Sequence, residues 1–169
     1  EHAGQLGQAQ LVGVFSNRDD APGLARASAA DLPVAWRSHH DDPSREAFDA
    51  KVIEILEAWQ PDLVALAGFM RILSPHFVQF YRHRLINIHP SLLPKYKGLD
   101  THRRALEAGD SHAGATVHWV TDALDDGEII DQIQVPIAPN DTPDTLRARV
   151  LASEHVLYPR AIRKLANEQ

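Results

Sequence analysis

The chain has 169 residues, of which 44% are apolar and 24% charged, and its formal net charge at pH 7 is -6. This length suits one domain with a sizeable core, and the composition is ordinary for a globular protein. The absence of cysteine excludes disulfides and thiolate chemistry. An acidic chain without a basic stripe is not expected to bind nucleic acid, and no apolar run approaches the roughly 18 residues of a membrane span.

The beginning of the chain, EHAGQLGQAQ, is polar and lacks the basic and apolar regions of a signal peptide. Together with the lack of cysteine, this favours a cytoplasmic protein. Local basic groups can still bind an anionic small molecule despite the net negative charge.

Predicted strands and helices alternate through the first half of the chain. Strands are expected at 10–17, 32–37 and 62–69, the last of them almost wholly apolar, which is typical of a strand covered on both faces. Helices are expected at 21–30, at 44–59 and from Ser74 onward, where Ser44 and Ser74 are candidate N-caps. Apolar residues recur at helical spacing between Ala47 and Trp59.

The second half begins with the short strand Leu85–His89. A helix capped by Thr101 and stopped by Gly109 follows, then two strands at Gly114–Thr121 and Glu128–Ile137. Thr142, Pro143 and Asp144 open a last helix that runs past His155. This alternation predicts an α/β Rossmann-like fold, a mostly parallel sheet with helices on both faces and a mixed C-terminal part.

Asn87 and His89 stand two residues apart at the end of an apolar strand. Side chains at i and i+2 point to one side of a strand, and ligands of open α/β sheets bind beyond the carboxyl ends of the strands. An amide and an imidazole there could bind one small polar group, and the imidazole could move a proton near neutral pH. The alternative is that both are buried polar residues satisfied by the backbone.

Asp122, Asp125 and Asp126 lie in the turn-rich segment TDALDDGE. Taken alone, such a turn is more often a solvated one whose carboxylates bond local backbone. With His118 on the preceding strand, however, one carboxylate could reach a site at the strand end. The ten histidines do not form H-x-x-x-H or H-E-x-x-H, so no metal site is expected.

Four segments carry a resemblance that covers nearly the whole chain: AGFMRILSP, NIHPSLLPKYKGLDTH, GATVHWVTDALDDGEIIDQ and SEHVLYP. They resemble the folate-dependent formyltransferase family, and within it the branch that formylates glycinamide ribonucleotide in purine synthesis. The GFMRILSP run and the Thr-His after KGLD favour this branch over the methionyl-tRNA branch. The resemblance implies transfer of a formyl group from 10-formyltetrahydrofolate as cosubstrate, without a metal, in a monomer or homodimer.

The resemblance also implies a role for individual residues. Asn87, His89 and Asp125 match the catalytic trio, and Leu93-Pro94 matches a cis peptide bond. The residues that match the folate pocket are Met70, Arg71, Ile72, Leu73, Thr121, Asp122 and Leu124. Arg45, His118 and Glu154 match contacts on the amine-substrate side.

The chain departs from the family pattern in two respects. It is expected to be one domain that lacks the family's first strand, the phosphate-binding turn after it, and a short C-terminal extension. LDDG replaces the more usual Leu-Asp-Gly-Gly, so Asp126 could alter the loop. A formyltetrahydrofolate hydrolase, a formyltransferase for another amine, and an inactive folate-binding fragment remain alternatives.

Overall fold

The computed structural model describes residues 6–167, which divide into two compact units. One unit contains residues 10–64 and 70–82, and the other contains residues 6–9, 65–69 and 83–167. They are called the first-half unit and the second-half unit, respectively. The predicted α/β class is confirmed, with the strands distributed over two sheets. The predicted single domain with an absent first strand stays a prediction.

The first-half unit contains a two-stranded parallel sheet, in which β1 (Val14–Ser16) pairs with β2 (Val34–Trp36). Its helical segments are α1 (Pro22–Ser28), the short η2 (His39–Asp41), α2 (Arg45–Glu57) and α3 (Pro75–Phe80). The predicted caps are confirmed, because Ser44 Oγ accepts from Ala47 N and Ser74 Oγ accepts from Phe77 N.

The core of the first-half unit lies where α2 and α3 pack together. Phe48, Phe77 and Tyr81 are almost fully buried, and the rings of Phe77 and Tyr81 lie 4.9 Å apart. The Tyr81 hydroxyl donates to Glu57 at 3.0 Å, which satisfies the one polar atom of that ring. The buried Asp49 carboxylate accepts from Ser74 N at 2.6 Å and so ties α2 to the start of α3.

The second-half unit contains a four-stranded sheet in the order β3-β4-β5-β6. The strands are β3 (Val64–Leu66, of which Val64 is counted with the first-half unit), β4 (Leu85–His89), β5 (His112–Trp119) and β6 (Ile129–Pro136). The pairs β4–β5 and β5–β6 are antiparallel, which confirms the mixed C-terminal part.

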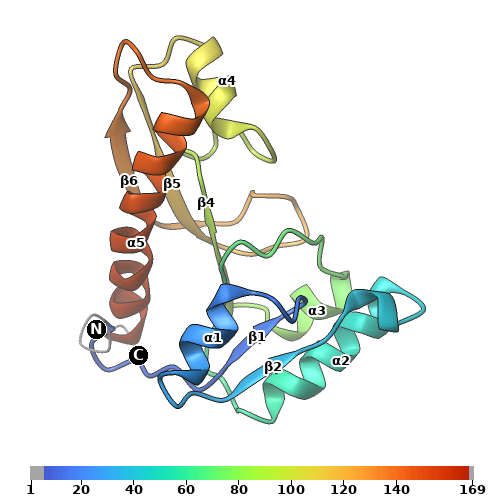
Figure 1. The fold of residues 1–169 in the computed structure, drawn as a ribbon. Coiled ribbons are helices and arrows are strands. Elements are labelled where there is room, and N and C mark those ends of the chain that lie inside the picture. The colour runs from blue at the N-terminus through green and yellow to red at the C-terminus, as the bar shows by residue number, and fades with distance from the viewer. Residues whose placement is uncertain (1–5, 168–169) are drawn as a thin grey trace. The chain divides into compact units, whose positions relative to one another are not determined.

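Two helices accompany this sheet, α4 (Thr101–Glu107) and the long α5 (Pro143–Asn167). α5 runs along β5 and β6 (Figure 1), and its Leu146, Val150 and Leu157 are fully buried. The Tyr158 hydroxyl donates to the Leu66 carbonyl at 2.7 Å and so connects α5 to β3. α4 begins differently from the prediction, because Asp100 is its N-cap residue and adopts a left-handed conformation, while Thr101 is inside the helix.

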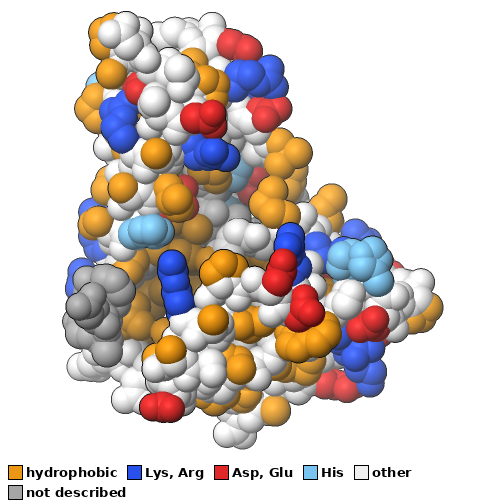
Figure 2. Space-filling view, in the orientation of Figure 1, with side chains coloured by type: hydrophobic (Ala, Val, Ile, Leu, Met, Phe, Trp, Pro, Cys, Tyr) orange, Lys and Arg blue, Asp and Glu red, His pale blue; other side chains and the backbone are white. Residues whose placement is uncertain are grey.

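No helix within residues 6–167 is both long and apolar enough to cross a membrane. The face drawn in Figure 2 carries Lys and Arg side chains interspersed with Asp and Glu side chains rather than a continuous basic stripe.

Candidate active site

The end of β4 presents Asn87 and His89 on the same side of the strand, as the sequence predicts. In the antiparallel register Asn87 lies opposite His118 and His89 lies opposite Thr116. Leu85 and Ile86 are almost fully buried, so β4 is fixed in the sheet by its apolar residues. The two polar side chains are thereby held at the edge where the chain leaves the strand.

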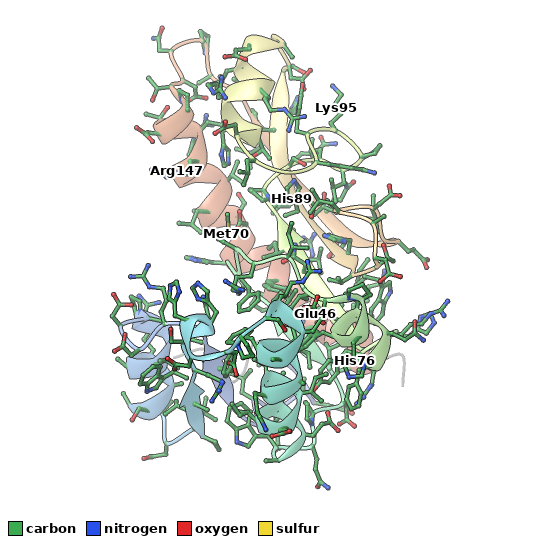
Figure 3. The ribbon with its side chains drawn as sticks, turned by 90° about the vertical axis from the view of Figure 1, so that its right-hand side faces the viewer. Glu46, Met70, His76, His89, Lys95 and Arg147 are labelled. Carbon is green, nitrogen blue, oxygen red and sulfur yellow. The ribbon has the colours of Figure 1, made fainter. Side chains whose placement is uncertain are left out.

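His89 is 6% exposed and has partners at both ring nitrogens. Its Nε2 lies 2.9 Å from the Tyr96 carbonyl oxygen, and its Nδ1 lies 3.4 Å from Asp125 Oδ2. A carbonyl can only accept, so Nε2 carries the proton and donates it to Tyr96. Nδ1 is therefore the atom that can gain or lose a proton while facing Asp125. Figure 3 shows His89 on β4 and Lys95 in the loop that follows it.

Asp125 is held in the turn between β5 and β6 in a left-handed conformation, with φ 48°. Aspartate is one of the few non-glycine residues that tolerate this region. Its carboxylate is 9% exposed and accepts from Gly98 N at 2.9 Å. Its other oxygen, Oδ1, lies 3.8 Å from His118 Nε2, so the carboxylate stands between two imidazoles.

His118 completes this group from the middle of the sheet. Its Nδ1 donates to the Trp119 carbonyl at 2.9 Å, and its Nε2 lies 3.5 Å from Asn87 Nδ2. Burial lowers the pKa of His118, which the Trp119 carbonyl and Asp125 only partly offset. In the neutral ring Nε2 is an acceptor, so the Asn87 amide donates one N–H to it and has the other N–H available.

Two further positions shape the β5–β6 turn. A Cβ added to Gly127 would lie 1.6 Å from the Trp119 carbonyl oxygen, so only glycine fits at this crossing. Asp126, by contrast, is not among the residues with positive φ, and its carboxylate pairs with the Lys97 ammonium. The backbone at Asp126 therefore does not need the left-handed conformation that favours glycine. Its ion pair with Lys97 connects the turn to the loop after β4.

The other predicted residues of the second-half unit lie close by in sequence or on α5. Thr121, Asp122 and Leu124 are exposed in the turn, with Leu124 65% exposed. Glu154 lies on α5, and burial raises the pKa of its carboxyl group. The Glu154 side chain is half-buried on the helix that packs against β5 and β6.

The remaining predicted residues belong to the first-half unit. Met70 and Ile72 are 78% and 72% exposed, which is high for large apolar side chains. The Arg71 guanidinium lies 5.3 Å from the centre of the Phe48 ring, and its Nε is buried without a hydrogen-bond partner. Arg45 opens α2 and pairs with Glu46 at 3.2 Å. The predicted grouping of these residues, together with Leu73, around one folate pocket with the β5–β6 turn stays a prediction.

Sequence reasoning missed the backbone groups that hold this site. The Tyr96 carbonyl and the Gly98 N–H contact His89 and Asp125, respectively, and neither contact depends on the identity of a side chain. The sequence KYKGLD offers Gly98 as the only signal of an unusual backbone. In the structure Tyr96 and Gly98 both have positive φ, 57° and 77°, and Leu93-Pro94 is cis, as the resemblance implied.

Within residues 6–167, no group of three or more His, Cys, Asp or Glu side chains is arranged to hold a metal ion. The cluster that the structure does assemble consists of one amide, two imidazoles and one carboxylate, contributed by β4, β5 and the turn after β5. Such a set can donate hydrogen bonds to an oxyanion and can exchange protons with a bound amine.

This α/β fold is that of a one-carbon transferase, and the chain belongs to the formyl transferase family, whose model matches residues 2–162. The phosphoribosylglycinamide formyltransferase of Escherichia coli K12 is 52% identical over 149 residues, which cover 88% of this chain and 70% of that protein. The trifunctional purine biosynthetic protein adenosine-3 of Drosophila melanogaster is 49% identical over 94% of this chain, but the match covers only 12% of that much longer protein.

Solved structures agree with these relatives. The phosphoribosylglycinamide formyltransferase of Coxiella burnetii superposes with a TM-score of 0.89 at 48% identity, covering 94% of this chain and 75% of that one. The glycinamide ribonucleotide transformylase 1 of Symbiobacterium toebii gives 0.91 at 46% identity with the same coverages. The family resemblance drawn from the sequence is thus confirmed.

Proposed function

We propose that the chain transfers the formyl group of 10-formyltetrahydrofolate to the amine of glycinamide ribonucleotide, a step of de novo purine biosynthesis. The observation that carries the proposal is the contact of His89 Nδ1 with Asp125 at 3.4 Å beside Asn87, in a chain 52% identical to the E. coli formyltransferase. The partners are therefore the folate cosubstrate and the nucleotide. A cytoplasmic monomer or homodimer remains the expectation for the protein.

In the proposed reaction the substrate amine attacks the formyl carbon, and a tetrahedral oxyanion forms. Asn87 has one amide N–H available because the other is directed at His118 Nε2. His89 uses its Nε2 proton for Tyr96, so a protonated Nδ1 is its donor to the oxyanion. Each donor aimed at such an oxyanion is typically worth about 3–4 kcal/mol.

Asp125 supplies the proton acceptor of this scheme. Its carboxylate lies 3.4 Å from His89 Nδ1 and so stands next to the ring that donates to the oxyanion. It also takes the proton of the attacking amine, directly or through a water molecule, and a proton is returned to the departing folate nitrogen. Positioned proton transfer of this kind contributes about 10²–10⁴-fold to a rate.

Folate binding is assigned, through the family resemblance, to Met70–Leu73 and to Thr121, Asp122 and Leu124. The high exposure of Met70, Ile72 and Leu124 supports this assignment, because large apolar side chains at a surface often mark a binding site. Arg45, His118 and Glu154 are assigned to the amine substrate. For His118 the closeness to Asn87 adds a second role, that of orienting the amide.

A related hydrolase, or a formyltransferase for another amine, would use the same three residues on a different acceptor. The test is an assay of the purified chain with 10-formyltetrahydrofolate and a panel of acceptors: glycinamide ribonucleotide, free glycinamide, unrelated primary amines and water alone. We expect formyl transfer to the ribonucleotide at a rate at least tenfold above all others. Release of formate at an equal rate without any amine would contradict the proposal in favour of the hydrolase, and binding of folate without turnover would favour the inactive fragment.

A further inference from the structure

The loop after β4 holds two of the proposed catalytic groups through its backbone. The carbonyl of Tyr96 accepts from His89 Nε2, and the N–H of Gly98 donates to Asp125 Oδ2, each at 2.9 Å. The two bonds come from neighbouring peptide groups, 96–97 and 97–98. The orientation of these two peptide planes therefore decides where the imidazole and the carboxylate stand.

The plane between Lys97 and Gly98 is the one that the sequence leaves free to rotate. Gly98 has φ 77°, and glycine populates positive and negative φ about equally well. A rotation of this peptide plane would turn the Gly98 N–H away from Asp125. Some other group must therefore hold the plane if Asp125 is to keep its place.

Arg104 on α4 contacts this plane directly. Its Nη1 donates to the Lys97 carbonyl at 2.7 Å and to the Leu99 carbonyl at 3.1 Å. The carbonyl of Lys97 and the N–H of Gly98 belong to the same planar trans peptide group and point in opposite directions. Arg104 thus holds one end of the plane whose other end donates to Asp125, and a bond at one end polarises the bond at the other.

The same guanidinium also reaches the residue that holds His89. Its central carbon lies 5.2 Å from the centre of the Tyr96 ring, a stacking distance for a cation and an aromatic ring. The Tyr96 hydroxyl is bonded in turn to Asp110 at 2.7 Å, which fixes the far side of the ring. Arg104 therefore contacts the loop at the Tyr96 ring and at the Lys97 and Leu99 carbonyls.

We propose that Arg104 is a positioning residue for formyl transfer: it fixes the 96–98 backbone so that His89 and Asp125 face the reacting formyl group. This inference rests on the proposed function. It assigns to Arg104 no contact with substrate, so its loss should lower kcat and leave the KM values largely unchanged. It also predicts a change at His89 that can be observed without any substrate.

Arg103 offers a matched control on the same helix. Its guanidinium pairs with Asp100 at 2.6 Å and Glu107 at 3.4 Å, and its side chain is 53% exposed. Arg103→Met and Arg104→Met remove the same charge and keep the aliphatic stem. They differ in whether bonds to the loop backbone are lost.

The experiment measures kcat, both KM values and the histidine side-chain ¹⁵N and ¹H resonances of the full chain. Arg104→Met should lower kcat at least tenfold, change each KM less than threefold, and shift or broaden the His89 Nε2–H signal. Arg104→Lys, which keeps one ammonium donor, should recover part of kcat, and it replaces the methionine variant if that one does not fold. Arg103→Met should stay within twofold of the original chain in every measure.

A kcat within twofold of the original for Arg104→Met would overturn the inference, as would an equal loss in Arg103→Met or an unchanged His89 signal. If the original chain transfers no formyl group, the proposed function fails by itself. The His89 signal then still decides whether Arg104 fixes the loop.

Discussion

Each of the two buried imidazoles has one nitrogen committed to a backbone carbonyl. His89 donates from Nε2 to Tyr96, and His118 donates from Nδ1 to Trp119. The opposite nitrogens, Nδ1 and Nε2, are thereby both directed at the Asp125 carboxylate, one to each oxygen. Two carbonyls thus determine which ring atoms are available for chemistry, and sequence spacing alone could not predict this.

The first prediction concerns the proposed catalytic trio. Asn87→Ala, His89→Ala and Asp125→Ala should each lower kcat by at least about 10²-fold, because each removes an oxyanion donor or the proton acceptor. Steady-state kinetics with glycinamide ribonucleotide and 10-formyltetrahydrofolate measure the effect. Asp126→Asn is the control, since this neighbouring carboxylate pairs with Lys97 and is 54% exposed. We expect it to keep kcat within about threefold.

Asp125→Asn is the sharpest member of the series, because it keeps the shape and loses the proton acceptor. Turnover near that of the original chain in this variant would show that Asp125 takes no proton. The assigned scheme would then be wrong even if the three alanine variants were inactive.

The second prediction concerns the pH dependence of stability. Burial lowers the pKa of His118, so the unfolded chain binds a proton at a higher pH than the folded chain does. The stability that comes from the neutral ring is present above the ordinary His pKa of about 6.5 and is lost as the pH falls below it. The free energy of unfolding should therefore fall between pH 7.5 and pH 5, with a slope of at most about 1.4 kcal/mol per pH unit for this proton.

His118→Gln should make this slope shallower, as measured by denaturant unfolding at several pH values. Some slope will remain, because burial also lowers the pKa of His102 on α4. His112→Gln, at an exposed position on the same strand, is the control and should leave the slope as it is. Parallel curves for the original chain and for His118→Gln would contradict the prediction.

At the scale of the elements, local sequence signals located most of the secondary structure. β4 has the bounds that were expected, and Ser44 and Ser74 cap their helices. β1 and β3 are shorter than their apolar runs, because an apolar run indicates burial and does not say how many residues find a pairing partner. The N-cap shifted from Thr101 to Asp100, a one-residue uncertainty that is common at helix ends.

The loop after β4 is the element that sequence patterns predict least well. Thr116 Oγ1 donates to the Ser91 carbonyl at 2.7 Å and accepts from Leu93 N at 3.1 Å, which fixes the segment before the cis bond. Gln132 adds bonds to Leu93 O and to Thr116 Oγ1. These contacts join residues 16 to 39 positions apart and leave no periodic pattern in the sequence.

The third prediction tests the close approach of Gly127, in the β5–β6 turn, to the Trp119 carbonyl at the end of β5. Gly127→Ala should lower the free energy of unfolding by at least about 2 kcal/mol, because its Cβ would meet the Trp119 carbonyl at 1.6 Å. Gly23→Ala inside α1 is the control, since nothing lies within 4 Å of its added Cβ. In a helix this change should be neutral or stabilising by about 0.5–1 kcal/mol. Equal stabilities of the two variants would show that the turn shifts freely.

At the scale of the whole molecule, the proposed site residues are distributed over both units. The trio and the β5–β6 turn belong to the second-half unit, whereas Arg45 and Met70–Leu73 belong to the first-half unit. From the sequence, the catalytic role of the trio and the ligand-binding roles of Arg45 and Met70–Leu73 were predicted only through the family resemblance. Neither charge nor periodicity identifies a segment such as GFMRILSP as ligand-binding.

The fourth prediction tests that assignment with a folate analogue that cannot transfer a formyl group. Titration of the ¹⁵N-labelled chain should shift backbone resonances of Met70–Leu73 and of Thr121–Leu124 with one common dissociation constant, because both segments are assigned to the same ligand. Resonances of Lys51–Glu54 on α2, whose side chains form an exposed ion pair, serve as an internal control. His89→Ala should bind the analogue within about threefold of the original chain, since its proposed role is in the chemical step. Shifts in one segment alone, or two different dissociation constants, would show that the two segments do not bind the same folate molecule. The catalytic assignment of Asn87, His89 and Asp125 would not be affected.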